Sequence, residues 1–310
     1  MRRYVLKRVV QTILTAWFTV TVVFVLLRLA PGDPAVSYAP PNPSSEQLEA
    51  IRREFGLDQP LLSQYWTFLT HLLHGDVGQS FQFRQSALTV VLERLPYTIT
   101  LAVAAIVITA VLAIPLGVWM ARRANTAGEL GANIATIAGQ SMPDFWIGFV
   151  LLIVFAVNLQ WFPSSGFTSI SSLVLPTLTI VVLQVALISR LVRREMSVNL
   201  NASYVTIARS RGVSERRLTW RYAFSNSAIP VVTALGTRFA AMLNGVVIVE
   251  VVFRWPGVGQ LVVDALERRD LPVIQATVLV TVLLALFVQL AVDLIYPLLD
   301  PRVRLGEGAR

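Results

Sequence analysis

Six long apolar runs constrain this chain of 310 residues more than any other feature. A helix needs about 20 mostly apolar residues to cross the hydrocarbon core of a bilayer. Runs of that kind occur at 9–29, 97–120, 134–157, 173–192, 229–253 and 273–294. More than half of the residues are apolar and only 14% are charged, which is typical of a polytopic membrane protein. The sequence therefore predicts an all-α membrane protein with six transmembrane helices.

Basic residues are concentrated in alternate connections between these runs. Positively charged loops resist translocation, so they mark the cytosolic side of the membrane. The basic residues of the predicted cytosolic segments are Arg2, Arg3, Lys7, Arg8, Arg122, Arg123, Arg193, Arg194, Arg209, Arg211, Arg216, Arg217, Arg221, Arg302, Arg304 and Arg310. Both termini are thus predicted to be cytosolic. The first run ends at Pro31 without a small-residue cleavage site, which predicts an uncleaved signal anchor. This topology accounts for the net charge of +8 without a nucleic acid partner.

The segment 31–96 is far longer than an ordinary connection and is predicted to fold outside the cytosol. It starts with Pro31-Gly32-Asp33-Pro34, which stops the first helix. Ser44 or Ser45 suits the start of an amphipathic helix that Gly56 ends, and Asp58 and Pro60 suit the start of another. The apolar faces of these two helices consist of Leu48, Ile51 and Phe55, and of Leu61, Tyr65, Phe68, Leu69 and Leu72. We expect these faces either to cover the transmembrane bundle or to contact an external solute-binding protein.

Several kinds of catalytic site are excluded by residues that the sequence lacks. It has no cysteine, and its single lysine, Lys7, does not follow the glycine-rich loop that a Walker-type phosphate site requires. The motifs Gly-x-Ser-x-Gly and His-Glu-x-x-His are absent as well. We therefore expect a chain that is not an enzyme and holds no cofactor. If ATP powers it, another subunit binds the ATP.

The only histidines, His71 and His74, would share one face of a helix. Two neutral imidazoles at this spacing suit a metal ion, although no third ligand is evident. A pair of packed or exposed histidines is the alternative.

Acidic residues in or near the apolar runs are candidate functional residues, because charge is costly there. Asp293 lies near the end of the sixth run, where anchoring or capping is expected. Glu250 is expected to pair with Arg238 or Arg254. These residues form no series that would relay protons across the bilayer, which counts against a proton-driven carrier.

Pro143 should kink the third predicted helix, because it removes a backbone hydrogen bond. Asp144 follows it directly. Two interpretations of Asp144 stay open: it lines a water-filled path, or it caps the helix after the kink.

The connection 193–228, which we name the basic loop, carries more pattern than its charge alone. Small residues there leave room for the close approach of another surface: Ala202, Ala208 and Ser210. Gly212 is suited to end a helix in the left-handed conformation, and Ser214 to start the next one. We therefore expect a short helix, a turn and a second helix that bind a soluble partner. A helix that only binds anionic lipid headgroups is the alternative, and it would need neither the small residues nor the helix stop.

The basic loop resembles the signature of a known family. Tyr204-Val205 with Ala208-Arg209-Ser210-Arg211-Gly212 is similar to the cytosolic signature of ABC-importer permeases of the peptide and nickel branch. The general form is Glu-Ala-Ala, three residues, then Gly, from which Thr206 and Ile207 depart. Further similarities to the first permease of that branch are Arg2-Arg3-Tyr4 with Arg8, Pro31-Gly32-Asp33-Pro34, Phe55-Gly56-Leu57-Asp58-Gln59-Pro60, His74-Gly75-Asp76-Val77-Gly78-Gln79-Ser80, Pro143 with Phe145-Trp146, Ser214-Glu215-Arg216-Arg217, Asn226, Ile229-Pro230-Val231-Val232-Thr233, Val249-Glu250-Val251-Val252-Phe253, Trp255-Pro256-Gly257-Val258-Gly259 and Leu299-Asp300-Pro301-Arg302.

The resemblance implies a type I ABC importer permease fold of six transmembrane helices in the plasma membrane of a prokaryote. Its implied partners are a second homologous permease, two ATPases that bind ATP and Mg²⁺, an extracytoplasmic solute-binding protein and membrane lipid. The implied solutes are dipeptides, oligopeptides, nickel chelates or related small molecules. The residues implied to couple the chain to an ATPase are Tyr204, Ala208, Arg209, Ser210, Arg211 and Gly212, and those implied for the path or its kink are Pro143 and Asp144.

The implied organisation has four parts. They are a cytosolic tail with the first helix at 1–30, an extracytoplasmic helical extension at 31–96, a permease core at 97–295 that includes the basic loop, and a cytosolic tail at 296–310. Two functions of other classes stay open at this point. One is a self-sufficient channel or ion-coupled carrier, and the other is a non-transporting scaffold or lipid-surface receptor.

Overall fold

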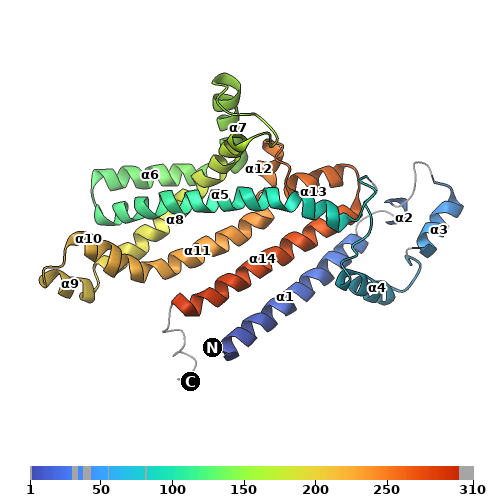
Figure 1. The fold of residues 1–310 in the computed structure, drawn as a ribbon, viewed down its shortest axis with the longest axis horizontal. Helices are drawn as coiled ribbons and strands as arrows, with labels where there is room; N and C mark the ends of the chain where they lie inside the picture. The colour runs from blue at the N-terminus through green and yellow to red at the C-terminus, as the bar shows by residue number, and fades with distance from the viewer. Residues whose placement is uncertain (1, 30–33, 38–42, 55, 81, 300–310) are drawn as a thin grey trace.

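The computed structural model describes the chain except for residues 1, 30–33, 38–42, 55, 81 and 300–310, and the described part is built from helices (Figure 1). Their bounds are α1 Arg2–Leu29, α2 Pro34–Ser37, α3 Ser45–Glu54, α4 Leu61–Leu73, α5 Ala87–Arg122, α6 Ala127–Ser141, α7 Asp144–Leu151, η1 Leu152–Asn158, η2 Ile170–Leu173, α8 Val174–Leu200, α9 Ser203–Ser210, α10 Glu215–Arg217, η3 Leu218–Ala223, α11 Phe224–Gly245, α12 Val247–Val252, α13 Val258–Glu267 and α14 Leu271–Leu299.

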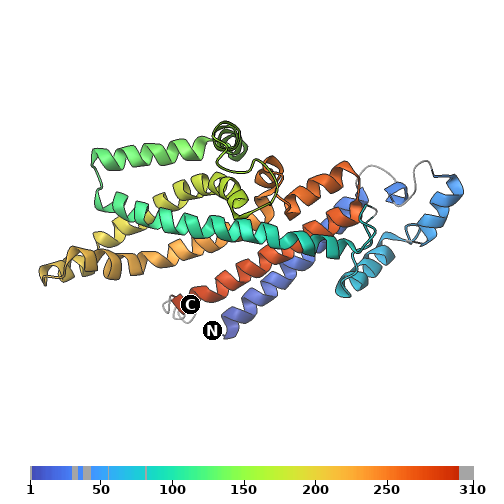
Figure 2. The same ribbon diagram turned by 45° about the horizontal axis from the view of Figure 1, so that its top comes forward.

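Long helices packed along their lengths form the body of the molecule (Figures 1 and 2). The most extensive packing between two helices is that of α5 on α8, and it depends on Gly117. A Cβ atom at Gly117 would lie 2.5 Å from the carbonyl oxygen of Ser189 and 2.6 Å from Cβ of Val192. A Cβ atom at Gly236 of α11 would likewise collide with Val292 of α14. Small residues therefore set how closely these helices approach, as is usual between helices in membranes.

Within the described residues, four helices are long and apolar enough to cross a membrane: Val5–Leu26, Ala87–Arg122, Ile170–Leu200 and Leu271–Leu294. They coincide with four of the six predicted runs. The third run is divided into α6 and α7, and this pair counts as a fifth span only if the two helices are taken together. The fifth run is divided at Val246 into α11 and α12. A multi-pass helical membrane protein is thus confirmed, whereas the count of six spans stays a prediction.

The break in the third run occurs where the proline predicted a kink. Met142 and Pro143 are extended, with ψ angles of 133° and 141°, and α6 and α7 differ in direction by 99°. A proline disfavours the helical conformation of the residue before it, so the first helix stops there. The sequence predicted a kinked helix, whereas the structure has two separate helices, and α7 runs in a different direction from α6 (Figure 1).

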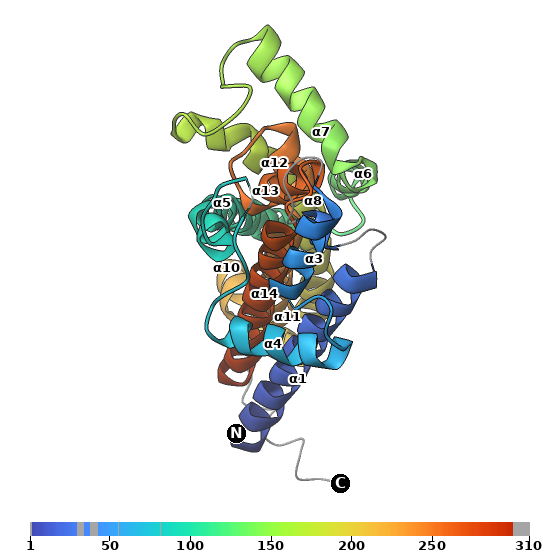
Figure 3. The same cartoon turned by 90° about the vertical axis from the view of Figure 1, so that its right-hand side faces the viewer.

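The amphipathic helices predicted after the first run are present as α3 and α4 (Figure 3). The side chains of Ser44 and Gln47 each accept a hydrogen bond from the other residue's backbone N–H, which is a capping box for α3. Gly56 follows in the left-handed region with φ of 61°. Phe55, which was assigned to the apolar face of α3, lies outside the described residues, as do the Pro31 to Asp33 part of the predicted helix stop and the tail at 300–310.

Helix α4 packs on α1 through aromatic contacts. The ring of Phe24 in α1 lies 5.3 Å from those of both Tyr65 and Phe68, and the Tyr65 hydroxyl is 2.6 Å from the hydroxyl of Thr21. At least part of the predicted extension therefore covers the helical body. The following turn is fixed by Ser80, whose hydroxyl donates a 2.5 Å hydrogen bond to the buried carboxylate of Asp270 before α14.

Glu250 differs from its sequence prediction. It pairs with neither Arg238 nor Arg254; its fully buried carboxylate accepts hydrogen bonds from the hydroxyl of Thr98, 2.6 Å away, and from two backbone N–H groups of α13. Those N–H groups belong to Gly259 and Gln260, at 2.6 and 3.1 Å. The unpaired N–H groups at a helix start favour a carboxylate, so this site satisfies the charge without an arginine.

Two glycines make room for this carboxylate. A Cβ atom at Gly257 would collide with the Glu250 carboxylate, and one at Gly259 would lie 2.6 Å from Cα of Val247. Trp255, between them and Glu250, is fully buried and donates from Nε1 to the carbonyl of Tyr97 at 3.0 Å. The Trp-Pro-Gly-Val-Gly motif therefore joins α12 and α13 to α5.

Asp293 has an ionic partner on another helix. Its carboxylate lies 3.4 Å from Nη1 of Arg8, which joins α14 to α1. This contact agrees with the anchoring role predicted for Asp293.

We predict that Gly259→Ala destabilises the protein by about 1–3 kcal/mol, because the added methyl group overpacks the contact with Val247 and Glu250. Gly131 in α6 is the matched control, since nothing lies within 4 Å of a Cβ atom built there. Gly131→Ala should be neutral or more stable by about 0.5–1 kcal/mol. Thermal unfolding of the detergent-solubilised variants measures both effects, and equal unfolding midpoints for Gly259→Ala and the unmodified chain would contradict this packing.

Candidate functional site

The basic loop forms a compact helical tip at the end of α8 and α11 (Figure 1). Helix α9 follows α8 after a two-residue connection, and α10 and η3 lead back into α11. The predicted helix, turn and second helix are therefore present. The tip stands far from α7 and α13, which lie toward the other end of the long helices.

Gly212 ends α9 as the sequence predicts. Its φ is 78°, in the left-handed region. Its N–H donates to the carbonyl of Arg209 at 3.0 Å, and the N–H of Val213 donates to the carbonyl of Ala208 at 3.3 Å. This pair of bonds is a Schellman motif, which satisfies the last carbonyls of the helix. Because a Cβ atom at Gly212 would meet nothing within 4 Å, the backbone conformation, and not space, favours glycine.

Ala208 faces the interior of the chain and not the outside. It is only 7% exposed and packs with the fully buried Val205 and Leu218 in a small cluster that Val213 and Tyr222 partly cover. The surface that its small side chain lets approach is thus η3 of the same chain. Sequence reasoning missed Val205 and Leu218, although their apolar side chains in a basic segment are a signal of a local core.

The outer face of α9 consists of other residues. Ile207 is 52% exposed, and Thr206, Arg209, Ser210 and Arg211 are exposed as well. A large exposed apolar side chain among polar ones is common at the centre of a protein–protein contact.

Two polar side chains of α9 are used within the loop. Nε of Arg209 donates to Oε1 of Glu215 at 2.8 Å, and this hydrogen bond lowers the pKa of the Glu215 carboxyl. The Ser210 hydroxyl donates to the carbonyl of Ile207 at 2.9 Å, inside its own helix. Of the basic residues in the predicted signature, Arg211 is therefore the one whose side chain makes no hydrogen bond or ion pair to the described part of the chain.

Asn199, which sequence reasoning did not single out, joins three helices. Its Oδ1 accepts a 2.6 Å hydrogen bond from the Tyr204 hydroxyl of α9. Its Nδ2 donates to the Ser227 hydroxyl of α11 at 3.0 Å and to the carbonyl of Glu195 in α8 at 3.0 Å. The position of α9 is thereby tied to both long helices. Nothing in the local sequence marks an asparagine near a helix end as such a link.

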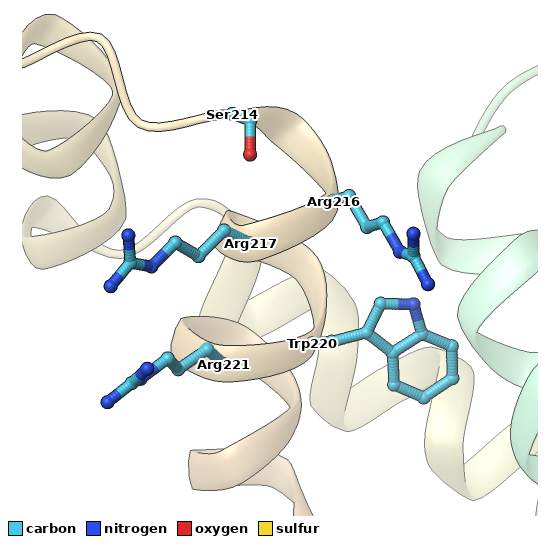
Figure 4. A pocket seen from close by; sticks show the side chains of 5 residues that line it. All are labelled: Ser214, Arg216, Arg217, Trp220 and Arg221. Carbon is cyan, nitrogen blue, oxygen red and sulfur yellow. The ribbon is translucent and has the colours of Figure 1, made fainter.

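A shallow depression beside α9 is lined by Ser214, Arg216, Arg217, Trp220 and Arg221 (Figure 4). Arg217 and Arg221 extend to the same side from successive turns, while Arg216 extends over Trp220. No acidic side chain lines it among the described residues. The depression therefore suits an acidic group of another molecule. Trp220 is the lining residue that the sequence did not indicate.

Pro143 and Asp144 are not brought to the basic loop. Pro143 precedes the first turn of α7, and its carbonyl accepts hydrogen bonds from the N–H groups of Trp146 and Ile147. Asp144 is the first residue of α7, half-buried, and its side chain hydrogen-bonds to no residue of the described ranges. The Asp144 side chain therefore does not cap α7 in this structure, and path lining stays a prediction.

The two histidines lie in different contacts. Nδ1 of His71 is 3.8 Å from a carboxylate oxygen of Asp76, and Nδ1 of His74 is 2.8 Å from the carbonyl of Thr70. In the part of the chain that the structure describes, no three His, Cys, Asp or Glu side chains are grouped to hold a metal ion.

The sequence matches two family models that together span most of the chain. Residues 113–305 match the binding-protein-dependent transport system inner membrane component, and residues 1–102 match the N-terminal model of the same kind of membrane component. A protein of Brucella abortus (strain 2308) is 38% identical over 98% of this chain and 99% of its own length.

Two further relatives are named for particular solutes. The dipeptide transport system permease protein DppB of Lactococcus lactis subsp. cremoris (strain MG1363) is 34% identical over 98% of this chain and its entire length. The glutathione transport system permease protein GsiC of Salmonella paratyphi A (strain ATCC 9150 / SARB42) is 37% identical over 98% of this chain and 99% of its length.

Two solved structures share the fold. The MetNI methionine ABC transporter in an inward-facing conformation has a chain with a TM-score of 0.55 at 14% identity, covering 68% of this chain and 96% of that one. A chain of an amino acid ABC transporter has a TM-score of 0.54 at 15% identity, covering 67% of this chain and 93% of that one. With the family matches and the signature of the basic loop, these similarities show that the chain belongs to the inner membrane components of binding-protein-dependent transport systems, in the dipeptide and oligopeptide branch of ABC-importer permeases.

Proposed function

We propose that this chain forms half of the translocation path of an ATP-driven importer for dipeptides, oligopeptides or related small solutes. The names of the Lactococcus and Salmonella relatives, which describe dipeptide and glutathione transport, support the solute class. The proposed partners are a second permease, two ATPases that bind ATP and Mg²⁺, and an extracytoplasmic binding protein. The proposed location is a prokaryotic plasma membrane, with both termini and the basic loop in the cytosol.

In this proposal α9 is the coupling helix that an ATPase holds. A coupling element must be held firmly by its own chain, or motion of the ATPase would bend it without moving the membrane helices. The observation that carries the proposal is the attachment of α9 at two places: the Asn199 hydrogen bonds and the packing of Ala208 on Leu218. Both attachments tie α9 to helices that continue into the body of the molecule.

The geometry divides the six coupling residues by role. Ala208 and Gly212 shape α9, Tyr204 ties it to Asn199, and Arg209 and Ser210 make bonds within the loop. The proposed contacts with the ATPase come from Ile207, Arg211 and the arginines of the depression beside α9. ATP-driven closure of the two ATPases would move both coupling helices together and shift the permeases between inward-open and outward-open states.

The proposed function is tested by reconstitution. The complete importer in liposomes should take up a labelled dipeptide only with ATP and the binding protein, and the isolated chain should transport nothing. Transport by the isolated chain without ATP would contradict the proposal and favour a channel or an ion-coupled carrier.

We predict that Asn199→Ala lowers the amount of solute moved per ATP while the ATPases still co-purify. The substitution removes the hydrogen bonds of Asn199 with the hydroxyls of Tyr204 and Ser227, at a cost of about 0.5–1.5 kcal/mol for each, while the Ser227 hydroxyl keeps its bond to the carbonyl of Ala223. Asn201→Ala is the matched control, because Nδ2 of Asn201 bonds only within its own helix end, to the carbonyl of Ser197. Equal uptake per ATP in both variants would count against transmission through Asn199.

We predict that Gly212→Ala weakens ATPase association roughly 5-fold, since an alanine in the left-handed region costs about 1 kcal/mol. The chain should still insert, because no atom lies near the new methyl group. Ser210→Ala, at an exposed position with a bond inside its own helix, serves as the control. Titration of the purified permeases with labelled ATPase measures the effect, and unaltered binding by Gly212→Ala would refute the role of the helix stop.

A further inference from the structure

Two arginines lie inside the predicted membrane spans with exposed side chains. Arg190 lies in α8, two residues before the end of the predicted fourth run, and Arg238 lies in α11, nine residues after the start of the predicted fifth run. Both are exposed. Nη1 of Arg190 donates a 2.8 Å hydrogen bond to Oε1 of Gln140 at the end of α6. Arg238 makes no side-chain hydrogen bond or ion pair with the residues that the structure describes.

The two arginines stand at nearly the same level along their helices. The hydrogen bond between Asn199 and Ser227 places these two residues side by side where α8 and α11 meet. Arg190 precedes Asn199 by nine residues and Arg238 follows Ser227 by eleven. At 1.5 Å per residue they are about 14 Å and about 16 Å from that bond in the same direction. A common level within the span is therefore shared by two positive charges.

An arginine at this level needs water or an anion. Placing a charged side chain in the hydrocarbon region is costly, so intramembrane charges usually face a water-filled cavity or the interior of a bundle. No carboxylate lies within ion-pair distance of either guanidinium among the described residues. The chain itself thus leaves both charges open to a ligand.

We propose that Arg190 and Arg238 line the water-filled path and bind the carboxylate of the passing solute, with Gln140 holding the Arg190 side chain in position. This inference rests on the proposed function and names the chemical class of ligand that the path selects. A guanidinium pairs with a carboxylate through two parallel N–H···O bonds, a geometry that no ammonium offers. Two arginines at one level give such a group two successive partners and let it leave either one.

The absence of cysteine from the chain gives a direct test. Arg190→Cys and Arg238→Cys each place the only thiol of this chain at one position. Phe18→Cys is the matched control, because Phe18 is 64% exposed midway along α1, which packs on the outer side of α14. The assembled importer in liposomes is treated with a cationic trimethylammonium-ethyl thiosulfonate or an anionic sulfonatoethyl thiosulfonate. Labelling of this chain is followed by mass, and uptake of a labelled dipeptide is measured alongside.

The expected result has three parts. Arg190→Cys and Arg238→Cys lower uptake about 10- to 100-fold, the range for loss of a hydrogen bond to a charged group. Both thiols react with the water-soluble reagents, whereas Phe18→Cys does not. The cationic reagent restores part of the uptake, because it returns the positive charge without the hydrogen bonds of a guanidinium, and the anionic reagent restores none.

Other results overturn the inference. If neither arginine position is labelled, the side chains face lipid or are covered by the partner permease. If both are labelled but the two reagents have the same effect on uptake, the positive charge does not act on the solute. The unmodified complex distinguishes failure of this inference from failure of the proposed function. If the unmodified complex shows no ATP-dependent uptake, the proposed function is wrong. If its uptake is normal but the thiols at positions 190 and 238 stay unlabelled, only the inference about the two arginines is wrong.

Discussion

The hydrogen bonds of Asn199 hold α9 against α8 and α11, and the proposed coupling depends on them. One amide side chain accepts from Tyr204 in α9 and donates to Ser227 in α11, while its own helix, α8, belongs to the body of the molecule. Without it, the described attachments of α9 would be its chain ends, the Arg209–Glu215 hydrogen bond and a small apolar cluster. A short helix outside the membrane is not stable alone, so its position is set by such tertiary contacts. Because of that attachment, we propose that the chain passes motion of α9 on to the long helices.

Small residues shape the structure at both ends of the molecule. At the basic loop, a glycine in the left-handed region and a buried alanine shape a helix whose outer face stays free. At the other end, Gly257 and Gly259 make room for the buried carboxylate of Glu250, which holds α12, α13 and α5 together. Between the ends, close approach at Gly117 and Gly236 gives α5, α8, α11 and α14 a tightly packed body. A body that is rigid in this way can pass a displacement from one end toward the other.

Local features of this fold were predictable from the sequence, and long-range ones were not. The helix stops at Gly56 and Gly212 and the change of direction at Pro143 follow from the conformational preferences of single residues. Four of the apolar runs lie in helices long enough to cross a membrane, although Ala87–Arg122 and Ile170–Leu200 extend beyond the runs at 97–120 and 173–192. The angle between α6 and α7 could not be predicted from the sequence, because it depends on the neighbouring helices as well as on Pro143.

The candidate site shows the same division. The signature identified the loop, but it gave no sign that Ala208 is buried against Leu218. The pairing of Glu250 with an arginine was wrong because its partners are a threonine 152 positions earlier and the start of a later helix, which no local pattern connects. Asn199 was missed for the same reason, since its partner Ser227 lies 28 positions later. The coupling role itself stays a prediction.

The distance between α9 and α8 during the transport cycle tests whether α9 passes motion on to the long helices. Ser210 of α9 and Val198 of α8 are both exposed, and the chain has no cysteine, so Ser210→Cys with Val198→Cys accepts one spin label on each helix. Pulsed electron–electron double resonance on the assembled importer then compares the distance between the two labels in the nucleotide-free and vanadate-trapped states. The account predicts one narrow distance distribution that is the same in both states, while uptake is retained. A distribution that broadens or shifts by several ångströms between the states would contradict it, because α9 would then move independently of the helices it is proposed to drive.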